Sequence, residues 1–362
     1  MYKLAISALI SALFISLPAA AAPVKHGAKV VSVKKSKAGV RRQAAADEPR
    51  MVKRVVMVRG KRKVVYQRLV SVGDAIPARP TVGDMAGLNL TRDPLDLKSN
   101  VALVLDQANS EVLFEKNANV ALPIASITKM MTGLVVVEAN QDMDEMLTVS
   151  EDDVDRAKFS SSRLKVGSQL SRRDMLHIAL MSSENRAASA LGHNYPGGLP
   201  AFVEAMNAKA RQLGMSETHY VDSSGLSKNN VASARDLAKL AQAAYEHPVL
   251  REYSTAPKAV VEANGRPMLF GTTNRLVAPN SGWEIGLQKT GFINEAGRCL
   301  MMQAVVEGRA VIMVLLDAKG SAARAADALR MRKWLSALKP PGFSTSTAAS
   351  PAVTTSYSAA GM

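Results

Sequence analysis

Residues 123–140 read PIASITKMMTGLVVVEAN and place a Ser-x-x-Lys pattern at the entry of an apolar helix. We expect this helix to run from about Ser126 to Glu138. The spacing of three residues puts the Ser126 hydroxyl and the Lys129 side chain on one face, one turn apart. A serine hydroxyl needs a base before it can act as a nucleophile, and a buried lysine can have its pKa lowered enough to serve as that base. This stretch therefore predicts a candidate nucleophile and its base.

The Ser-x-x-Lys pattern is a weak signal by itself. It recurs at three other places, Ser32/Lys35, Ser162/Lys165 and Ser336/Lys339. Ser126 differs from these because it follows a Pro-Ile-Ala entry and opens a long apolar helix. Taken alone, Ser126 and Lys129 would still be interpreted as a helix cap and a solvated lysine.

Two further patterns change this balance. Ser183-Glu184-Asn185 lies 57 residues after Ser126, at the expected end of a second helix. Lys289-Thr290-Gly291 lies 106 residues beyond Ser183, at the expected end of an apolar strand, and Lys-Thr-Gly occurs once in the chain. Three patterns in this order, on a helix start, a helix end and an edge strand, form a strong joint signal.

The hydrophobic patterning predicts strands at both ends of the body and helices between them. Residues 101–105 and 112–115 flank a turn and predict a hairpin. Further helices are expected at 172–181, 202–213, 233–247 and 322–338, and further strands at 268–270, 285–289, 300–306 and 311–316. We therefore expect a mixed α/β (α+β) body. Its terminal strands and final helix would share one antiparallel sheet, with a helical region inserted.

These motifs resemble those of the penicillin-binding serine DD-peptidases, which share the set with class A β-lactamases. The similarity extends beyond the motifs to the stretches MSSENRAASALGHNYPGG, AFVEAMNAKARQLGM, SARDLAKL and QKTGF. These stretches resemble the D-alanyl-D-alanine endopeptidase branch of the D-Ala-D-Ala carboxypeptidase family. The resemblance covers about residues 95–338. It implies a β-lactamase/DD-peptidase-like fold, with an antiparallel sheet and an inserted helical region.

The resemblance also implies catalytic roles. Ser126 would attack the carbonyl of a D-Ala residue and form an acyl-enzyme, and Lys129 would take the proton of Ser126. Ser183 would sit between Lys129 and the leaving nitrogen and relay the proton. The backbone N–H groups of Ser126 and Phe292 would form the oxyanion hole.

Substrate-binding roles follow from the same resemblance. Asn185 would hydrogen-bond the substrate amide, and Lys289 and Thr290 would hold a substrate carboxylate. Gly291 would let the strand approach the ligand without a Cβ in the way. We expect no cofactor and no metal, because the chain has one cysteine, Cys299, and five histidines without a close pair. Cys299 is expected to pack in the core.

Two other functions compete with this interpretation. A class A β-lactamase needs a glutamate after Ser-x-Asn to activate the deacylating water, and no Glu-x-x-Leu-Asn lies between Asn185 and Lys289. Penicillin is therefore expected to remain as a slowly released covalent adduct. The second competitor is an idle wall-binding or penicillin-sensing module, and the intact Ser126, Lys129 and Lys289 argue against it.

The two ends of the chain are expected to lie outside the catalytic body. Residues 1–21 have a lysine, an apolar run of about 14 residues and a small-residue exit, which predicts a cleaved secretory signal and a periplasmic location. Residues 22–92 are expected to form a basic, disordered leader, residues 93–338 the peptidase domain, and residues 339–362 a disordered Ser/Thr/Ala/Pro-rich tail.

The net charge of +15 belongs mainly to the leader. Between Lys25 and Arg79 there are 16 Lys and Arg residues against three acidic residues, which leaves the rest of the chain near neutral. Nucleic acid is not the expected partner of an exported protein. The leader would instead contact anionic wall polymers or the surface of a membrane, or act only as a solubilising segment.

The expected substrates are peptidoglycan stem peptides, with β-lactams as covalent inhibitors. Carboxypeptidases of the resembled family carry a further β-rich domain and an amphipathic helix that holds them on the membrane. Here only 24 polar, proline-containing residues follow Leu338, which predicts an unanchored enzyme that works within the wall. We therefore expect cleavage of D-alanyl cross-links, with trimming of terminal D-Ala as the alternative.

Overall fold

The strands expected at the two ends of the body join in one antiparallel sheet. The computed structural model describes residues 51–58, 61–68 and 80–338. In the central sheet the strand order is β11-β12-β13-β3-β4, so that the last strand of the chain, β13, lies beside the first strand of the body, β3. The bounds are β3 Ser99–Asp106, β4 Val112–Lys116, β11 Glu284–Ile293, β12 Gly297–Val306 and β13 Arg309–Ala318. The predicted α+β class is confirmed, with β11 as an edge strand of the sheet.

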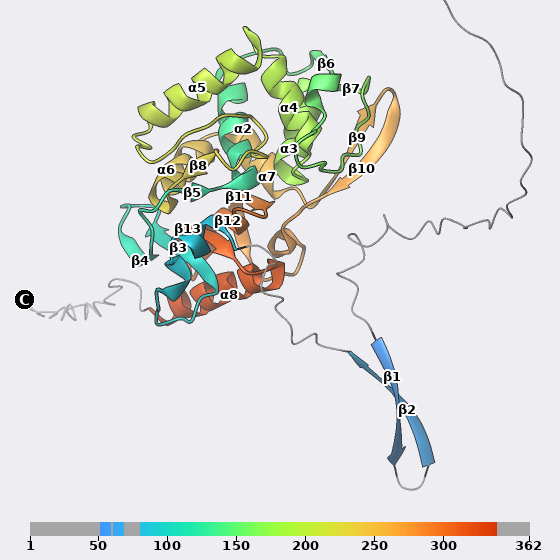
Figure 1. Cartoon of the computed structure of the whole chain (residues 1–362), viewed down its shortest axis with the longest axis vertical. Coiled ribbons are helices and arrows are strands. Elements are labelled where there is room, and N and C mark those ends of the chain that lie inside the picture. Colours follow the sequence, from blue (N-terminus) through green and yellow to red (C-terminus); the bar gives the residue numbers. More distant parts are fainter. Residues whose placement is uncertain (1–50, 59–60, 69–79, 339–362) are drawn as a thin grey trace, which may run out of the picture. The chain divides into compact units, whose positions relative to one another are not determined.

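Alternating residues of the sheet fill two separate hydrophobic cores. On β3, Val101, Leu103 and Leu105 pack with the helical region, whereas Ala102 and Val104 pack against α8 (Ser321–Ala337). This alternation is the two-residue period of a strand that is covered on both faces. In Figure 1, α8 covers one face of the sheet and the inserted helices lie beyond the other. The final helix therefore packs against the same sheet that the terminal strands form, as expected from the sequence.

The inserted region is mainly helical. Its helices are α2 Thr128–Glu138, α3 Arg172–Met181, α4 Asn185–His193, α5 Gly198–Gln212, α6 Ala234–Tyr245 and α7 Pro248–Thr255. The expectation for α3 agrees with the observed bounds. The Ser233 side chain caps α6 by accepting the Asp236 N–H. Two helices are not predicted from the sequence: α4, which begins two residues after Ser183, and α7, which begins at Pro248, where the sequence predicts only the end of α6.

Three short two-stranded sheets complete the inserted region. They pair β5 (Leu122–Pro123) with β8 (Val231–Ala232), β6 (Met146–Thr148) with β7 (Gln169–Ser171), and β9 (Lys258–Ala263) with β10 (Arg266–Gly271). The strand expected at 268–270 is therefore part of a separate hairpin, because its pairing partner is β9 and not the central sheet.

The leader contains regular structure where the sequence reading expected disorder. Strands β1 (Met51–Val58) and β2 (Lys61–Arg68) form an antiparallel hairpin. Both strands are rich in valine, a residue that favours extended backbone. The predicted signal segment 1–21, the other leader residues up to 79 and the tail 339–362 lie outside the described residues.

The folded body begins before the expected boundary at residue 93. Residues 82–85 form the short helix α1, and Val82 donates its backbone N–H to the Glu295 carbonyl at 2.9 Å. The Thr81 hydroxyl donates to the buried Asp317 carboxylate at 2.7 Å. Residues 80–92 therefore belong to the body, because buried hydrogen bonds attach them to the sheet.

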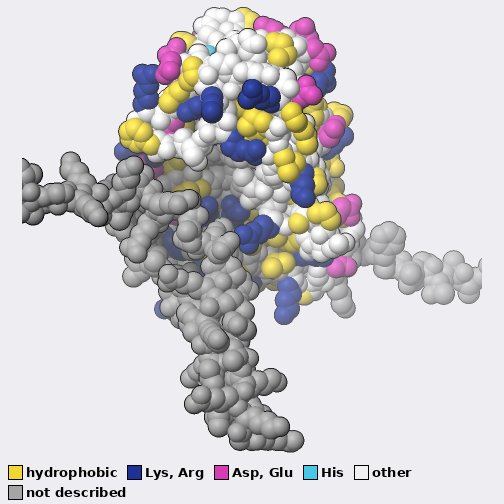
Figure 2. All heavy atoms as spheres, turned by 90° about the vertical axis from the view of Figure 1, so that its right-hand side faces the viewer, with side chains coloured by type: hydrophobic (Ala, Val, Ile, Leu, Met, Phe, Trp, Pro, Cys, Tyr) yellow, Lys and Arg dark blue, Asp and Glu magenta, His cyan; other side chains and the backbone are white. Residues whose placement is uncertain are grey.

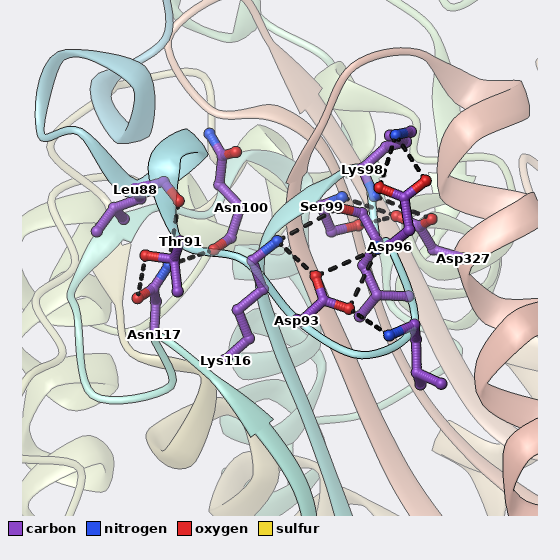
Figure 3. A network of polar contacts seen from close by, with 12 residues as sticks. Leu88, Thr91, Asp93, Asp96, Lys98, Ser99, Asn100, Lys116, Asn117 and Asp327 are labelled. Carbon is purple, nitrogen blue, oxygen red and sulfur yellow. Dashed lines mark hydrogen bonds and ion pairs between the residues drawn. The ribbon is translucent and has the colours of Figure 1, made fainter.

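A buried polar network lies where the chain enters β3 (Figure 3). The Lys116 ammonium and the Asp93 carboxylate form an ion pair at 3.0 Å, with both side chains 5% exposed. On α8, the Asp327 carboxylate accepts hydrogen bonds from the backbone N–H groups of Lys98 and Ser99 and from the Ser99 hydroxyl. These contacts fix the start of the sheet to its covering helix.

No helix within the described ranges combines the length and the apolar composition needed to cross a membrane.

We expect Asp327→Ala to lower the free energy of unfolding by about 2–3 kcal/mol, because the buried Ser99 N–H and hydroxyl would lose their acceptor. Asp96→Ala is the matched control. Asp96 is exposed and forms its ion pair with Lys98 in solvent, so loss of this pair should leave stability nearly unchanged. Denaturant unfolding of both variants measures the difference. Equal stabilities would contradict the anchoring role of Asp327.

Candidate active site

The sequence predicts that Ser126 lies in the first turn of an α-helix. In the structure, Ser126 lies in a tight turn that precedes the helix. Residues Ala125–Ile127 form a 3-10 turn, and α2 begins at Thr128. Ala125 has a positive φ of 48°, a conformation that is uncommon for a residue with a Cβ. The turn leaves Ser126 partly exposed, while its neighbours Ala125 and Ile127 are buried.

Two glycines pack closely against this turn. A Cβ on Gly225 would lie 2.0 Å from the Ala125 carbonyl oxygen. A Cβ on Gly291 would lie 2.8 Å from the Ile124 carbonyl oxygen and 3.1 Å from the Ser126 backbone nitrogen. The backbone therefore fits at both places only without a side chain. For Gly291 this adds a second reason for the missing side chain, since the nearest neighbour of a Cβ would be the turn that carries Ser126.

Lys129 is buried beside Ser126. Its side chain has no exposed surface, and its ammonium group donates to Ser126 Oγ at 3.0 Å, to Asn185 Oδ1 at 2.7 Å and to the Ser224 carbonyl at 2.5 Å. Burial lowers the pKa of Lys129 from its usual value to about 7, although the charges of Asp222 and Glu184 act in the opposite direction. A substantial fraction of neutral amine is therefore present at neutral pH, in contact with the Ser126 hydroxyl.

A loop formed by residues 222–227 also contacts Lys129, and the sequence does not predict this contact. Asp222 accepts hydrogen bonds from the backbone N–H groups of Ser224, Gly225 and Ser227, which fixes the Ser224 carbonyl toward Lys129. The Thr132 hydroxyl on α2 donates to the adjacent Ser223 carbonyl at 2.6 Å. An Asp followed by Ser and Gly is a turn signal that could have identified this loop, although not its contact with the lysine.

Ser183 contacts the other buried lysine. Lys289 on β11 donates to Ser183 Oγ at 3.0 Å and to the Thr290 carbonyl at 2.8 Å, and Ser183 has a positive φ of 62°. The family resemblance implies that Ser183 lies between Lys129 and the leaving nitrogen of a substrate. In the structure its hydroxyl accepts from Lys289, and its own proton is free for donation.

Lys289 is fully buried, and burial lowers its pKa well below the usual range, with the charges of Lys129 and Arg324 acting in the same direction. A substrate carboxylate beside Lys289 would favour the charged form.

Asn185 and Thr290 each contact one of these two lysines. Asn185 Nδ2 donates to Ser160 Oγ at 3.0 Å, while its Oδ1 accepts from Lys129 and has a second lone pair for a substrate N–H. The Thr290 hydroxyl pairs with the Thr273 hydroxyl at 2.7 Å. Ser160 and Thr273 were not identified from the sequence.

Phe292 follows the Lys-Thr-Gly motif on edge strand β11 and is 47% exposed. The Arg298 guanidinium lies 3.9 Å from the centre of its ring. An edge strand presents unpaired backbone N–H and C=O groups, which an extended peptide can use. The placement of Phe292 agrees with a site that binds peptide along β11.

Cys299 is fully buried on β12, as expected, and burial raises the pKa of its thiol to about 12. The thiol therefore stays protonated and packs in the core. Among the described residues, no group of three or more His, Cys, Asp or Glu side chains could hold a metal ion.

The site brings a hydroxyl, a buried amine, an amide and a second buried amine together from three separate segments of the chain. This arrangement can activate a serine for attack on a carbonyl carbon and can hold a substrate anion near Lys289.

The comparisons with known proteins agree with this geometry. A family profile described as D-alanyl-D-alanine carboxypeptidase matches residues 89–320. A D-alanyl-D-alanine endopeptidase of Pseudomonas aeruginosa is 47% identical over 268 residues, covering 74% of this chain and 84% of the relative. A D-alanyl-D-alanine endopeptidase of Escherichia coli is 40% identical over 263 residues, covering 72% and 84%. Cefotaxime-bound penicillin-binding protein D2 of Listeria monocytogenes matches with a TM-score of 0.60 at 31% identity, covering 67% of this chain and 98% of that protein.

We expect the rate of acylation by a fluorescent penicillin to depend on pH through Lys129. Because only the neutral amine can accept the Ser126 proton, and the pKa of Lys129 is about 7, the rate should rise as the pH increases. The neutral fraction grows from about 0.1 at pH 6 to about 0.9 at pH 8, which predicts about a ninefold increase in rate. Stopped-flow or gel-based labelling measures this profile. A rate that is constant between these pH values would contradict the assignment of Lys129 as the base.

Proposed function

The chain belongs to the D-alanyl-D-alanine carboxypeptidase family of serine peptidases, and we propose that it cleaves D-alanyl cross-links in peptidoglycan through an acyl-enzyme on Ser126. The chain is a serine DD-peptidase, a hydrolase. The observation that carries the proposed mechanism is the hydrogen bond between the fully buried Lys129 ammonium and Ser126 Oγ.

The proposed acylation begins with attack of Ser126 Oγ on the D-Ala carbonyl carbon, while neutral Lys129 accepts the hydroxyl proton. The backbone N–H groups of Ser126 and Phe292 would stabilise the oxyanion. The C–N bond then breaks while Ser183 donates its proton to the leaving nitrogen and takes up the proton that Lys129 had accepted from Ser126, which returns Lys129 to its neutral form. Ser183 is suited to this step because its oxygen already accepts a hydrogen bond from Lys289. Water would then hydrolyse the ester and restore Ser126.

Binding of the substrate anion follows from the charge of the site. Lys289 and the Thr290 hydroxyl would hold the carboxylate next to the scissile bond, which would favour the charged form of Lys289. The carboxylate would also reduce the repulsion between the two buried lysines. Asn185 would accept the N–H of the substrate amide. β-lactams carry a similar carboxylate, and the Listeria relative has been solved with cefotaxime and with ampicillin bound.

The preference for cross-links is supported by the endopeptidase relatives in Pseudomonas and Escherichia. More distant relatives that are named carboxypeptidases support the alternative, removal of terminal D-Ala. The edge of β11 and the exposed ring of Phe292 would be available to a peptide substrate of either kind.

We expect the full-length chain to release monomers from purified cross-linked muropeptide dimers faster than it releases D-Ala from pentapeptide monomers. Chromatography with mass spectrometry measures both products. Ser126→Ala is the control and should abolish both reactions and penicillin labelling, with an unchanged melting temperature. Efficient D-Ala release with untouched dimers would establish a carboxypeptidase.

The proposed location is the periplasm, with the leader in contact with anionic wall or membrane surfaces. Six residues of strands β1 and β2 are Lys or Arg. The sequence from Lys25 to Arg79 has 16 Lys and Arg residues against three acidic ones, whereas both basic and acidic side chains are visible on the face of the body shown in Figure 2. The leader is therefore the part of the chain best suited to bind an anionic polymer.

We expect a chain without residues 22–71 to acylate normally and to lose most of its salt-sensitive binding to purified peptidoglycan sacculi and anionic vesicles. Co-sedimentation at about 50 and 200 mM salt tests this, since screening weakens such contacts. Full-length protein with Lys61, Arg62 and Lys63 replaced by Gln serves as the matched variant and should show an intermediate loss. Equal binding by all three proteins would leave the leader without an electrostatic role.

A further inference from the structure

Three consecutive residues at the start of α4 hold one segment of the loop that precedes β7. We name residues 155–164 the strap. Within it, Ser162 donates its hydroxyl to the Glu184 carboxylate, Ser160 accepts from Asn185 at 3.0 Å, and the Leu164 carbonyl accepts from Arg186 at 2.7 Å. The strap is therefore attached to the same turn of chain that contains the Ser-x-Asn motif.

The strap is also attached to parts of the molecule outside α4. Lys158 forms an ion pair at 2.6 Å with Glu295, in the turn that joins β11 to β12, so this contact links the strap to the strand that carries Lys289. At its other end, the Arg163 guanidinium lies 4.5 Å from the centre of the Phe270 ring on β10. The strap thus connects the helical region to the edge of the central sheet.

Glu184, the middle residue of the Ser-x-Asn motif, is well placed to control the strap. Its side chain is buried, with 8% relative exposure, and it makes no capping hydrogen bond to α4. A buried carboxylate costs free energy unless it is hydrogen-bonded, and Ser162 supplies that hydrogen bond. The Ser162 oxygen in turn accepts the Leu164 N–H at 3.1 Å, so the carboxylate orders a strap turn.

We propose that Glu184 is a positioning residue for acylation, because its hydrogen bond with Ser162 fixes the strap and thereby holds Asn185 in the orientation that contacts Lys129. Asn185 is held between the two, with Nδ2 on Ser160 of the strap and Oδ1 on the Lys129 ammonium. Release of the strap removes the Ser160 contact and leaves the Asn185 amide free to rotate. The alignment of both the base and the substrate amide then suffers.

The charge of Glu184 gives a second, separable effect. The charged groups around Lys129 are Glu184 at the N-cap of α4, Asp222 in the loop of residues 222–227, and Lys289 on β11. Both acids raise the pKa of Lys129 against the effect of burial. Removal of the Glu184 charge therefore lowers that pKa further, so that neutral amine forms at lower pH.

Three substitutions in the full-length chain separate the hydrogen bond from the charge. Glu184→Ala removes both, Ser162→Ala removes only the hydrogen bond, and Glu184→Gln removes only the charge. Acylation by a fluorescent penicillin on the high-pH plateau is expected to slow about tenfold in each Ala variant and to stay within about threefold of the parent in Glu184→Gln. The double Ala variant should be no slower than Glu184→Ala, because both changes break one interaction.

The pH profile supplies an independent measurement. The acid limb should move to lower pH in Glu184→Gln and Glu184→Ala and stay unmoved in Ser162→Ala. Glu204→Gln, at an exposed position on α5, is the control and should match the parent in rate and profile. Wild-type rates in both single Ala variants, a Glu184→Gln as slow as Glu184→Ala, or additive losses in the double variant would overturn the proposal.

This inference depends on acylation at Ser126 and not on the preference for cross-links. A parent chain that trims pentapeptides would overturn the proposed specificity and leave the comparison of these variants intact. Ser162→Ala changes one partly buried hydroxyl in a loop, so it tests the proposal even if Glu184→Ala fails to fold.

Discussion

The burial of the Lys129 ammonium group is the constraint on which the rest of the site depends. A charged amine without solvent contact is unfavourable, so the surrounding chain has to supply acceptors or let the amine lose its proton. Here a serine hydroxyl, an asparagine amide and a backbone carbonyl surround it. These partners come from the nucleophile turn, from α4 and from the loop ordered by Asp222. Three segments of the chain therefore contact this one side chain.

Lys289 extends this constraint to the sheet. Two fully buried lysines in one site repel each other, and each is easier to keep neutral than charged in the absence of an anion. A substrate that brings a carboxylate to Lys289 relieves part of this cost, whereas a neutral peptide does not. The same pair of lysines therefore determines both the binding of the substrate anion and the fraction of neutral amine at Lys129.

Much of this arrangement could be predicted from the sequence, because the three motifs lie on strongly patterned elements. The apolar helix after Ser126 and the apolar strand before Lys289 are visible in the residue pattern, and the central sheet follows from the strands at both ends. The contacts of Ser183 could not be predicted, because two lysines compete for one hydroxyl and only the fold decides between them. Ser160 and the Ser224 carbonyl were missed since they act through loop geometry. Helix α4 was missed because it starts within the motif itself.

The two glycines beside the nucleophile turn have a consequence for how the protein can diversify. The turn of Ala125 and Ser126 is clamped between a loop and a strand at distances that no side chain can occupy. Neither Gly225 nor Gly291 can be substituted without displacing backbone. A lineage that adapts to a new stem peptide or escapes an inhibitor has to do so away from this turn, for example at the exposed ring of Phe292. The reacting centre stays rigid while its margins evolve.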